Sequence, residues 1–141
     1  MTAREALSHP NGTRTCVQIL VVDDFEPWCR FIRALLEARQ EWRVVGEAHD
    51  GHAAIEKAKE LQPDLILLDI GLPGLNGIEV SCQLRQIVPN SRIIFVTESN
   101  AKTVIDAALG TGAVGYVIKH NAVSELLSAI EAALEKKSFV R

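Results

Sequence analysis

The sequence predicts an α/β fold in which five parallel strands form one sheet and helices cover both faces, in the order (βα)5. Short runs of apolar, β-branched residues alternate along the chain with longer segments whose apolar residues recur at helical spacing. The short runs are apolar on both faces, as in strands buried in the middle of a parallel sheet. Right-handed crossovers between such strands place helices on both sides of the sheet.

Five segments have the length and composition of strands. The four most apolar are residues 17–22, 65–68, 93–96 and 114–118. Residues 43–48 give a weaker strand signal. We therefore expect residues 43–48 to lie nearer an edge of the sheet than the other four.

A helical segment follows each predicted strand. Their apolar stripes begin at Trp28, Ala54, Val80, Val104 and Val123. Pro27 suits the first turn of the first helix, and Asp50 suits the N-cap of the second. Asn76 followed by Glu79 predicts a capping box at the third helix. Asn121 is the candidate cap of the last helix.

Composition excludes several classes of protein. The 141 residues suffice for one domain with a real core, and a net charge of -3 gives no reason to expect direct nucleic-acid binding. No apolar run approaches the roughly 20 residues of a membrane helix, and the N-terminus lacks the apolar centre of a signal peptide. We expect a cytoplasmic domain at residues 16–137, a flexible tail at 1–15, and a tail or linker start at 138–141.

Cysteine and histidine spacing gives no metal or redox motif. Cys16, Cys29 and Cys82 lie far apart and form no CxxC pair, which favours three reduced thiols. His49 and His52 flank the start of the second predicted helix without a recognisable ligand spacing. We expect both histidines at the surface.

Residues whose side chains can take part in chemistry follow four of the predicted strands. They are Asp23 and Asp24 after the first, Asp69 after the third, Thr97 after the fourth and Lys119 after the fifth. Each residue alone could be a turn former, a helix cap or a solvated charge. Parallel strands, however, bring their carboxyl ends to one edge, where ligand sites lie in such sheets. We therefore expect these side chains to converge.

Three clustered carboxylates repel one another unless a cation is present. Mg²⁺ suits such a site, because it takes few protein carboxylates, keeps waters and leaves positions for phosphate oxygens. One carboxylate can then act as a nucleophile, as in aspartyl-phosphate formation. Lys119 would offset negative charge on the phosphoryl group, and the Thr97 hydroxyl could donate a hydrogen bond to it.

Four segments resemble the receiver domain of bacterial two-component response regulators. They are VVDD at 21–24, LILLDIGLPGLNGIE at 65–79, IIFVTES at 93–99 and GYVIKH at 115–120. The resemblance covers residues 17–134 and is greatest to receivers that precede a helix-turn-helix output domain. It implies a flavodoxin-like fold and a phosphoprotein that works in a phosphorelay.

The resemblance implies a role for each carboxylate. Asp69 would accept a phosphoryl group from a sensor histidine kinase or a phosphotransfer protein. Asp24 and Asp69 would bind Mg²⁺ through their carboxylates, and Gly71 through its backbone carbonyl. Asp23 would act mostly through a metal-bound water.

The resemblance also implies a conformational switch. Thr97 and Lys119 would contact the phosphoryl group, and the ring of Tyr116 would change position with Thr97. The altered surface would be formed by the fourth helix, the fifth strand and the fifth helix. Through this surface the domain would control a downstream partner or an output domain, and the outcome would be regulation of transcription. The resemblance also allows homodimerisation on phosphorylation.

Three other functions remain open. The first is a phosphorylation-independent interaction module with a receiver fold. The second is an aspartyl-phosphate hydrolase, which Gly71 disfavours because that class has a second acid at this position. The third is a flavin or nucleotide domain, which the acidic residues after the first strand disfavour. We expect a switch rather than an enzyme, with only slow autodephosphorylation. It is either a stand-alone receiver or a regulator without its output domain.

Overall fold

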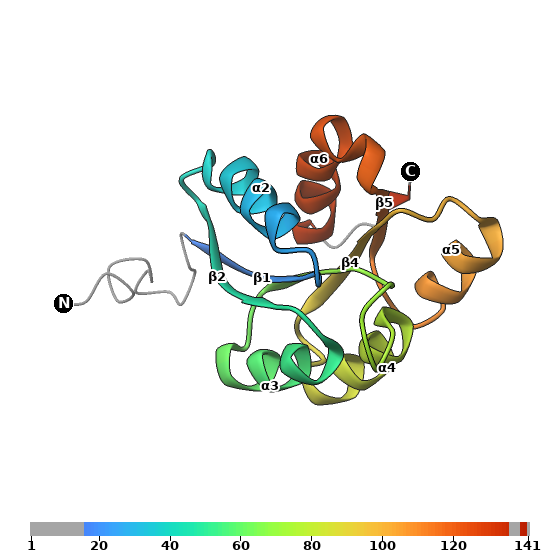
Figure 1. The fold of residues 1–141 in the computed structure, drawn as a ribbon. Coiled ribbons are helices and arrows are strands. Elements are labelled where there is room, and N and C mark those ends of the chain that lie inside the picture. Colours follow the sequence, from blue (N-terminus) through green and yellow to red (C-terminus); the bar gives the residue numbers. More distant parts are fainter. Residues whose placement is uncertain (1–15, 136–138, 141) are drawn as a thin grey trace.

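Neighbouring strands of the sheet all run parallel, in the order β2-β1-β3-β4-β5-β6 (Figure 1). The computed structural model describes residues 16–135 and 139–140. Five strands confirm the sequence prediction: β1 Val17–Val22, β2 Trp42–Ala48, β3 Leu65–Leu68, β4 Arg92–Thr97 and β5 Gly115–Ile118. β2 lies at one edge, as its weaker pattern predicted.

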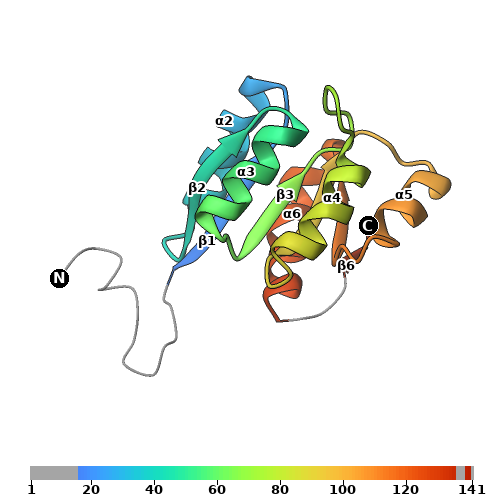
Figure 2. The same ribbon diagram turned by 90° about the horizontal axis from the view of Figure 1, so that it is seen from below.

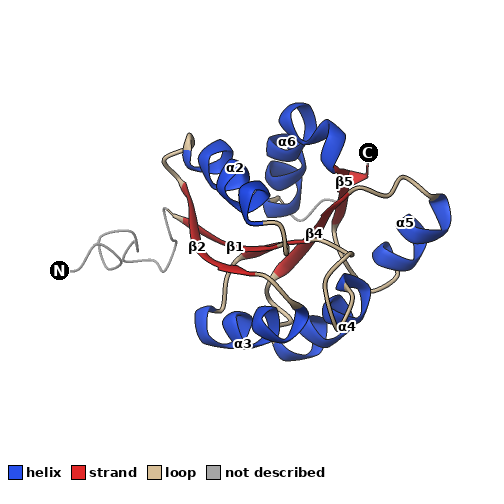
Figure 3. Ribbon diagram, viewed as in Figure 1, coloured by secondary structure: helices blue, strands red, loops and turns tan. Residues whose placement is uncertain are grey.

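Helices cover both faces of this sheet (Figure 1 and Figure 3). On one face lie α2 Glu26–Glu37 and α6 Ala122–Leu134, the latter preceded by the short 3-10 helix η1 Lys119–Asn121. The helices α3 Gly51–Leu61, α4 Gly77–Ile87 and α5 Lys102–Leu109 pack on the other face. Figure 2 shows α3 and α4 side by side in front of the sheet. The predicted flavodoxin-like (βα)5 arrangement is therefore confirmed.

Side chains of each inner strand alternate between two hydrophobic clusters. In β1, Ile19 and Val21 pack beneath α2 and α6. Leu20 and Val22 pack against the opposite group of helices. All four side chains are almost completely buried, because a parallel strand that is covered on both faces leaves neither set of side chains in water.

A bulge interrupts this alternation in β2. Ile19 pairs with Val44, but the next residue of β1 pairs with Gly46, so Val45 is an extra residue. Val44 belongs to the cluster beneath α2, whereas Ala48 belongs to the cluster on the α3 side. The bulge therefore reverses which residues face α2, and Glu47 points toward that helix, as bulges commonly re-aim side chains.

Local capping chemistry fixes where the helices begin. The Asp50 carboxylate accepts a hydrogen bond from the Ala53 N–H at 2.8 Å. Asn76 and Glu79 form the predicted capping box. Asn121 occupies the N-cap position of α6, but its side chain makes no capping hydrogen bond.

The predicted chain ends lie almost entirely outside the described residues. The expected tail at residues 1–15 lies outside the described residues, as do positions 138 and 141. Phe139 and Val140 form the short strand β6 beside Gly115 and Tyr116 of β5, where the sequence suggested only a tail. Among the described residues, no helix is long and apolar enough to cross a membrane.

Gly77 allows α4 to start directly against the loop that follows β3. A Cβ atom at this position would collide with the Asp69 carbonyl oxygen and lie 2.7 Å from Ile70 Cα. We expect Gly77→Ala to lower the free energy of unfolding by about 1–3 kcal/mol, the usual cost of overpacking, in urea titrations. Gly71→Ala is the matched control, since its Cβ would meet only Asp69 Oδ2 at 3.9 Å. Equal stability of the two variants would contradict this interpretation.

Candidate functional site

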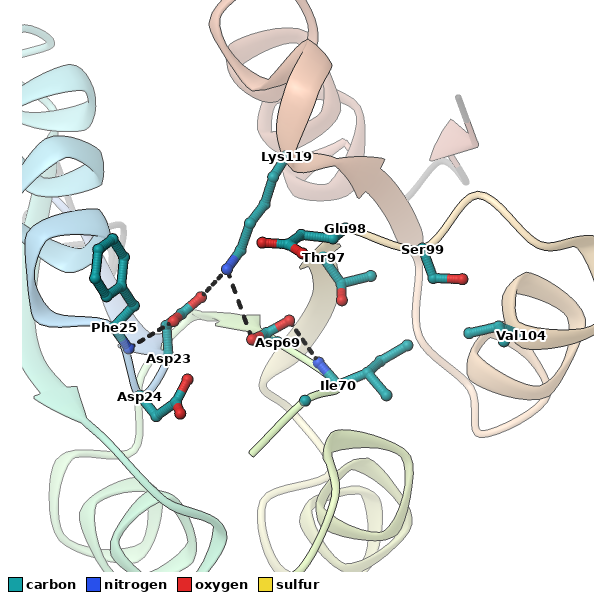
Figure 4. A pocket seen from close by; sticks show the side chains of 11 residues that line it. Asp23, Asp24, Phe25, Asp69, Ile70, Thr97, Glu98, Ser99, Val104 and Lys119 are labelled. Atoms are coloured by element: carbon teal, nitrogen blue, oxygen red, sulfur yellow. Dashed lines mark hydrogen bonds and ion pairs between the residues drawn. The ribbon is translucent and has the colours of Figure 1, made fainter. Parts of the chain in front are cut away.

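The carboxyl ends of four strands surround an open cavity of about 430 Å³ (Figure 4). Its walls include the residues that the sequence singled out: Asp23, Asp24, Asp69, Thr97 and Lys119. Asp23 and Asp24 follow β1, Asp69 follows β3, Thr97 ends β4, and Lys119 follows β5. The predicted convergence at one edge of the sheet is confirmed.

The ammonium group of Lys119 lies between two carboxylates (Figure 4). Its Nζ atom is 2.7 Å from Asp23 Oδ2 and 3.6 Å from Asp69 Oδ2. The shorter contact is a close ion pair. The side chains of Asp23 and Asp69 are only 2% and 9% exposed, so Lys119 compensates charge that water cannot solvate.

Backbone amides fix the orientation of both buried carboxylates. Asp23 Oδ1 accepts a hydrogen bond from the Phe25 N–H at 2.9 Å, and Asp69 Oδ1 accepts one from the Ile70 N–H at 2.9 Å. In each residue the other oxygen is the one directed at Lys119. Chain turns immediately after β1 and β3 thus hold the two acids in place around the ammonium group.

Burial has opposite effects on the two partners of the ion pair. Burial raises the pKa of Asp23, and the neighbouring Lys119 opposes this only in part. Burial lowers the pKa of Lys119, but the interactions with Asp23, Asp69 and Glu98 outweigh that effect and raise it overall. Lys119 therefore carries its positive charge at neutral pH.

Trp28 and Glu98 also contribute to the site, although the sequence analysis gave them no role there. The Trp28 ring centroid lies 5.1 Å from Lys119 Nζ, a distance suited to a cation–π interaction. Glu98 lines the cavity next to Thr97. Trp28 begins the apolar stripe of its helix, and only the fold shows that this end of the stripe lies beside Lys119.

The three aspartates form a group of oxygen donors. One carboxylate oxygen from each of Asp23, Asp24 and Asp69 lies within 4.8 Å of the other two. Asp24 is exposed, while the other two are buried. Gly71 lines the same cavity and adds no side chain to it. An all-oxygen donor set with excess negative charge beside an open cavity fits Mg²⁺, which retains several waters when bound.

Thr97 and Tyr116 lie on neighbouring strands next to the site. Thr97 is 4% exposed and reaches the cavity wall. Tyr116 is completely buried, packs near Phe95 with ring centroids 6.3 Å apart, and donates a hydrogen bond from its hydroxyl to the Ser99 carbonyl oxygen at 2.7 Å. Tyr116 is thus tied to the loop after β4 and does not line the cavity.

Known proteins with similar sequences include response regulators and proteins named as transcriptional regulators. The model of the family described as "Response regulator receiver domain" matches residues 19–131. The nitrate/nitrite response regulator protein NarL of Escherichia coli K12 is 38% identical over 115 residues, which are 82% of this chain and 53% of NarL. A putative transcriptional regulator of Pseudomonas aeruginosa is 37% identical over 117 residues, 83% of this chain and 56% of that protein. The chain spans about half the length of these relatives.

Solved structures share the fold. A LuxR-family two-component response regulator from Aurantimonas sp. SI85-9A1 has a TM-score of 0.84 and 35% identity, covering 88% of this chain and 89% of that one. The isolated REC domain of Salmonella enterica RcsB, determined with the phosphomimetic BeF3-, has a TM-score of 0.84 and 27% identity. The match covers 89% of this chain and 94% of that chain. The response regulator domain of Thermotoga maritima CheB has a TM-score of 0.80 and 31% identity. The match covers 85% of this chain and 97% of that chain.

Burial of Tyr116 predicts a measurable shift in its ionisation. Burial raises its pKa above 10.0, and the hydrogen bond that its hydroxyl donates to the Ser99 carbonyl oxygen requires the protonated form. Tyr116 is the only tyrosine of the chain, so the ultraviolet absorbance of tyrosinate reports it alone. We expect a midpoint above 10.0 in the native protein and a return toward about 10 in urea.

The same shift determines how stability depends on pH. Because the folded-state pKa is the higher one, Tyr116 favours the folded state fully below the unfolded pKa, and this contribution is lost as pH rises through the folded pKa. Tyr116→Phe should make the free energy of unfolding less dependent on pH above about 10. A native midpoint at or below that of the urea-unfolded chain would contradict the prediction.

Proposed function

This chain belongs to the receiver domain family of two-component response regulators, and from that membership we propose that Asp69 accepts a phosphoryl group from a sensor histidine kinase or a phosphotransfer protein. Receiver domains are phosphoryl acceptors and act between histidine kinases and output domains. The observation that carries the proposal is the position of Asp69, which faces the cavity with one oxygen 3.6 Å from Lys119 Nζ.

Phosphoryl transfer to Asp69 follows from ordinary displacement chemistry. A carboxylate oxygen of Asp69 attacks the phosphorus atom of a phosphohistidine, the phosphorus–nitrogen bond breaks, and the imidazole leaves with the electron pair. Lys119 is already charged and fixed beside Asp69. Its ammonium group therefore needs little rearrangement to stabilise negative charge on the transferring group.

Receiver domains generally depend on Mg²⁺, and the donors of this chain fit that ion. Asp24, Asp69 and the Gly71 carbonyl would bind it directly, and Asp23 would act mostly through a bound water. The ion, when bound, neutralises charge on the phosphoryl group. Asp23 has a second task in this proposal, because it shares Lys119 with Asp69 and keeps the ammonium group close to the acceptor.

The output would be a shift between two packings of the surface formed by α5, β5 and α6. Phosphorylation adds strong hydrogen-bond acceptors next to Thr97 at the cavity wall. Movement of Thr97 toward the phosphoryl group would vacate space for the Tyr116 ring, which would have to give up its hydrogen bond to Ser99. A charge change at Asp69 would thereby alter a surface read by another protein.

The proposal places this chain in the cytoplasm as a switch rather than an enzyme with turnover. Its downstream partner would be an output domain or a separate protein that regulates transcription, since the similar Pseudomonas aeruginosa protein is named a transcriptional regulator. Homodimerisation on phosphorylation is compatible with this role. The chain itself would not bind nucleic acid, in keeping with its net charge of -3.

Phosphorylation at a single residue is directly testable. Incubation with Mg²⁺ and a small phosphodonor should add the mass of one phosphate to the intact protein. Asp69→Asn should abolish this gain, because an amide is a poor nucleophile. Asp106→Asn is the matched control, since Asp106 lies on the exposed side of α5 in an ion pair with Lys102, and it should phosphorylate normally.

The metal requirement gives a second arm of the same experiment. EDTA should abolish the mass gain, and Asp24→Asn should reduce it at least about tenfold, the loss typical of an impaired metal site. Asp24 is exposed, so this variant should keep the wild-type melting temperature. A gain that persists in Asp69→Asn, or full phosphorylation in EDTA, would rule out the proposed chemistry.

The conformational switch requires a separate test of transmission. Thr97→Ala should still accept a phosphoryl group, but it should not pass the change to Tyr116. In NMR spectra recorded with Mg²⁺ and beryllofluoride, shifts should extend over residues 101–120 in the wild type and stay near Asp69 in the variant. If shifts remain near Asp69 in both proteins, partners must read the phosphoryl site directly.

A further inference from the structure

We propose that Cys29, Glu47 and His49 form a zinc site between α2 and β2, apart from the three aspartates. The thiol of Cys29, one carboxylate oxygen of Glu47 and one imidazole nitrogen of His49 all lie within 4.8 Å of one another. These donors come from a helix, a strand and the residue just beyond that strand. The spacing of Cys29 and His49 in the sequence therefore gives no sign of the group.

The bulge in β2 creates this arrangement. Without the extra residue Val45, continued alternation from Val44 would direct Glu47 toward α3. The bulge turns Glu47 toward α2 instead, and His49 Nε2 then lies 3.7 Å from Glu47 Oε1. Cys29 meets them from the buried side of α2, which runs alongside β2 (Figure 1).

Arg33 holds Glu47 in an orientation suited to metal binding. Both its Nε and its Nη2 contact Glu47 Oε2, at 3.2 and 3.1 Å. Arg33 is itself fixed by a hydrogen bond from Nη1 to the Val44 carbonyl oxygen at 3.2 Å. Glu47 Oε1 remains directed at His49. Outer partners that fix a ligand in this way are typical of zinc sites.

The chemistry of the three donors selects the ion. Thiolate, imidazole and carboxylate are the ligands of Zn²⁺, and three protein ligands with an open fourth position for water are common. Mg²⁺ and Ca²⁺ instead prefer oxygen ligands only. Bond lengths of about 2.0–2.3 Å require the three donors to draw closer; His49, whose side chain is 49% exposed, has room to move.

Binding of Zn²⁺ would release the Cys29 proton to solvent. The thiol now donates to the Asp23 carbonyl oxygen at 3.5 Å. Burial raises the pKa of this thiol, and repulsion from the nearby Glu47 carboxylate adds to the effect. A divalent cation between the two reverses that repulsion, and coordinated thiols are deprotonated. The bound ion would join α2 to the edge strand β2 immediately beside the chain segment that carries Asp23.

Cobalt(II) spectroscopy separates this site from the aspartate group. Co²⁺ added to the reduced full chain should give the near-ultraviolet thiolate-to-cobalt absorption band, which an all-oxygen site cannot produce. His49→Gln should lose most of the band. His52→Gln, Cys82→Ser and Asp24→Asn should retain it, because none of these residues belongs to the proposed site. Zn²⁺ should displace Co²⁺ and abolish the band.

Thermal unfolding gives an independent reading, because an ion that binds only the folded chain raises its melting temperature. Zn²⁺ should raise the melting temperature of the wild type and of His52→Gln, but not that of His49→Gln. Cys29 is completely buried and Cys29→Ala could unfold, so the exposed His49 is the decisive position. Absence of the cobalt band in the wild type would overturn the proposal. So would a full band in His49→Gln, or loss of the band in Cys82→Ser.

Discussion

The position of one ammonium group organises the carboxyl edge of the sheet. Lys119 Nζ lies between Asp23 and Asp69, so one cation compensates the charge of two buried acids. Removing Lys119 would leave two buried carboxylates with only backbone amides for partners. The loops after β1, β3 and β5 thus depend on one another, and the Asp69 carboxylate is held in a fixed orientation beside the ammonium group.

The sequence alone predicted most of the fold and the grouping of the site residues, because the patterns that indicate them are local and repeated. Buried strands of a parallel sheet are apolar throughout, and polar residues at their ends must share one edge. That reasoning placed Asp23, Asp24, Asp69, Thr97 and Lys119 together without any contact being known. Capping at Asp50 and Asn76 was predictable for the same reason, since a cap involves only neighbouring residues.

Features that depend on tertiary packing were not predictable. A bulge in β2 reverses the direction of Glu47, and the alternating pattern alone points that side chain to the wrong face. The contact of Trp28 with Lys119 joins a helix to a distant strand end, while the Ser99 acceptor for Tyr116 is a backbone oxygen that has no sequence signature. A pairing as short as β6 carries too few residues to show a periodicity.

Asp23 connects the two sites proposed for this chain. Its carboxylate shares Lys119 with Asp69, the proposed phosphoacceptor, while its backbone carbonyl accepts a hydrogen bond from the Cys29 thiol. Both proposed sites therefore share the turn after β1.

The most direct test of the central claim is a crystal structure with Mg²⁺ and beryllofluoride, the phosphoryl mimic used with the RcsB receiver domain. The account predicts beryllium bonded to an Asp69 oxygen and Mg²⁺ bound by Asp24, Asp69 and the Gly71 carbonyl. Lys119 should then have turned from Asp23 toward a fluoride. A structure with Asp69 unmodified and Lys119 still paired with Asp23, under conditions that saturate the protein with both ligands, would contradict it.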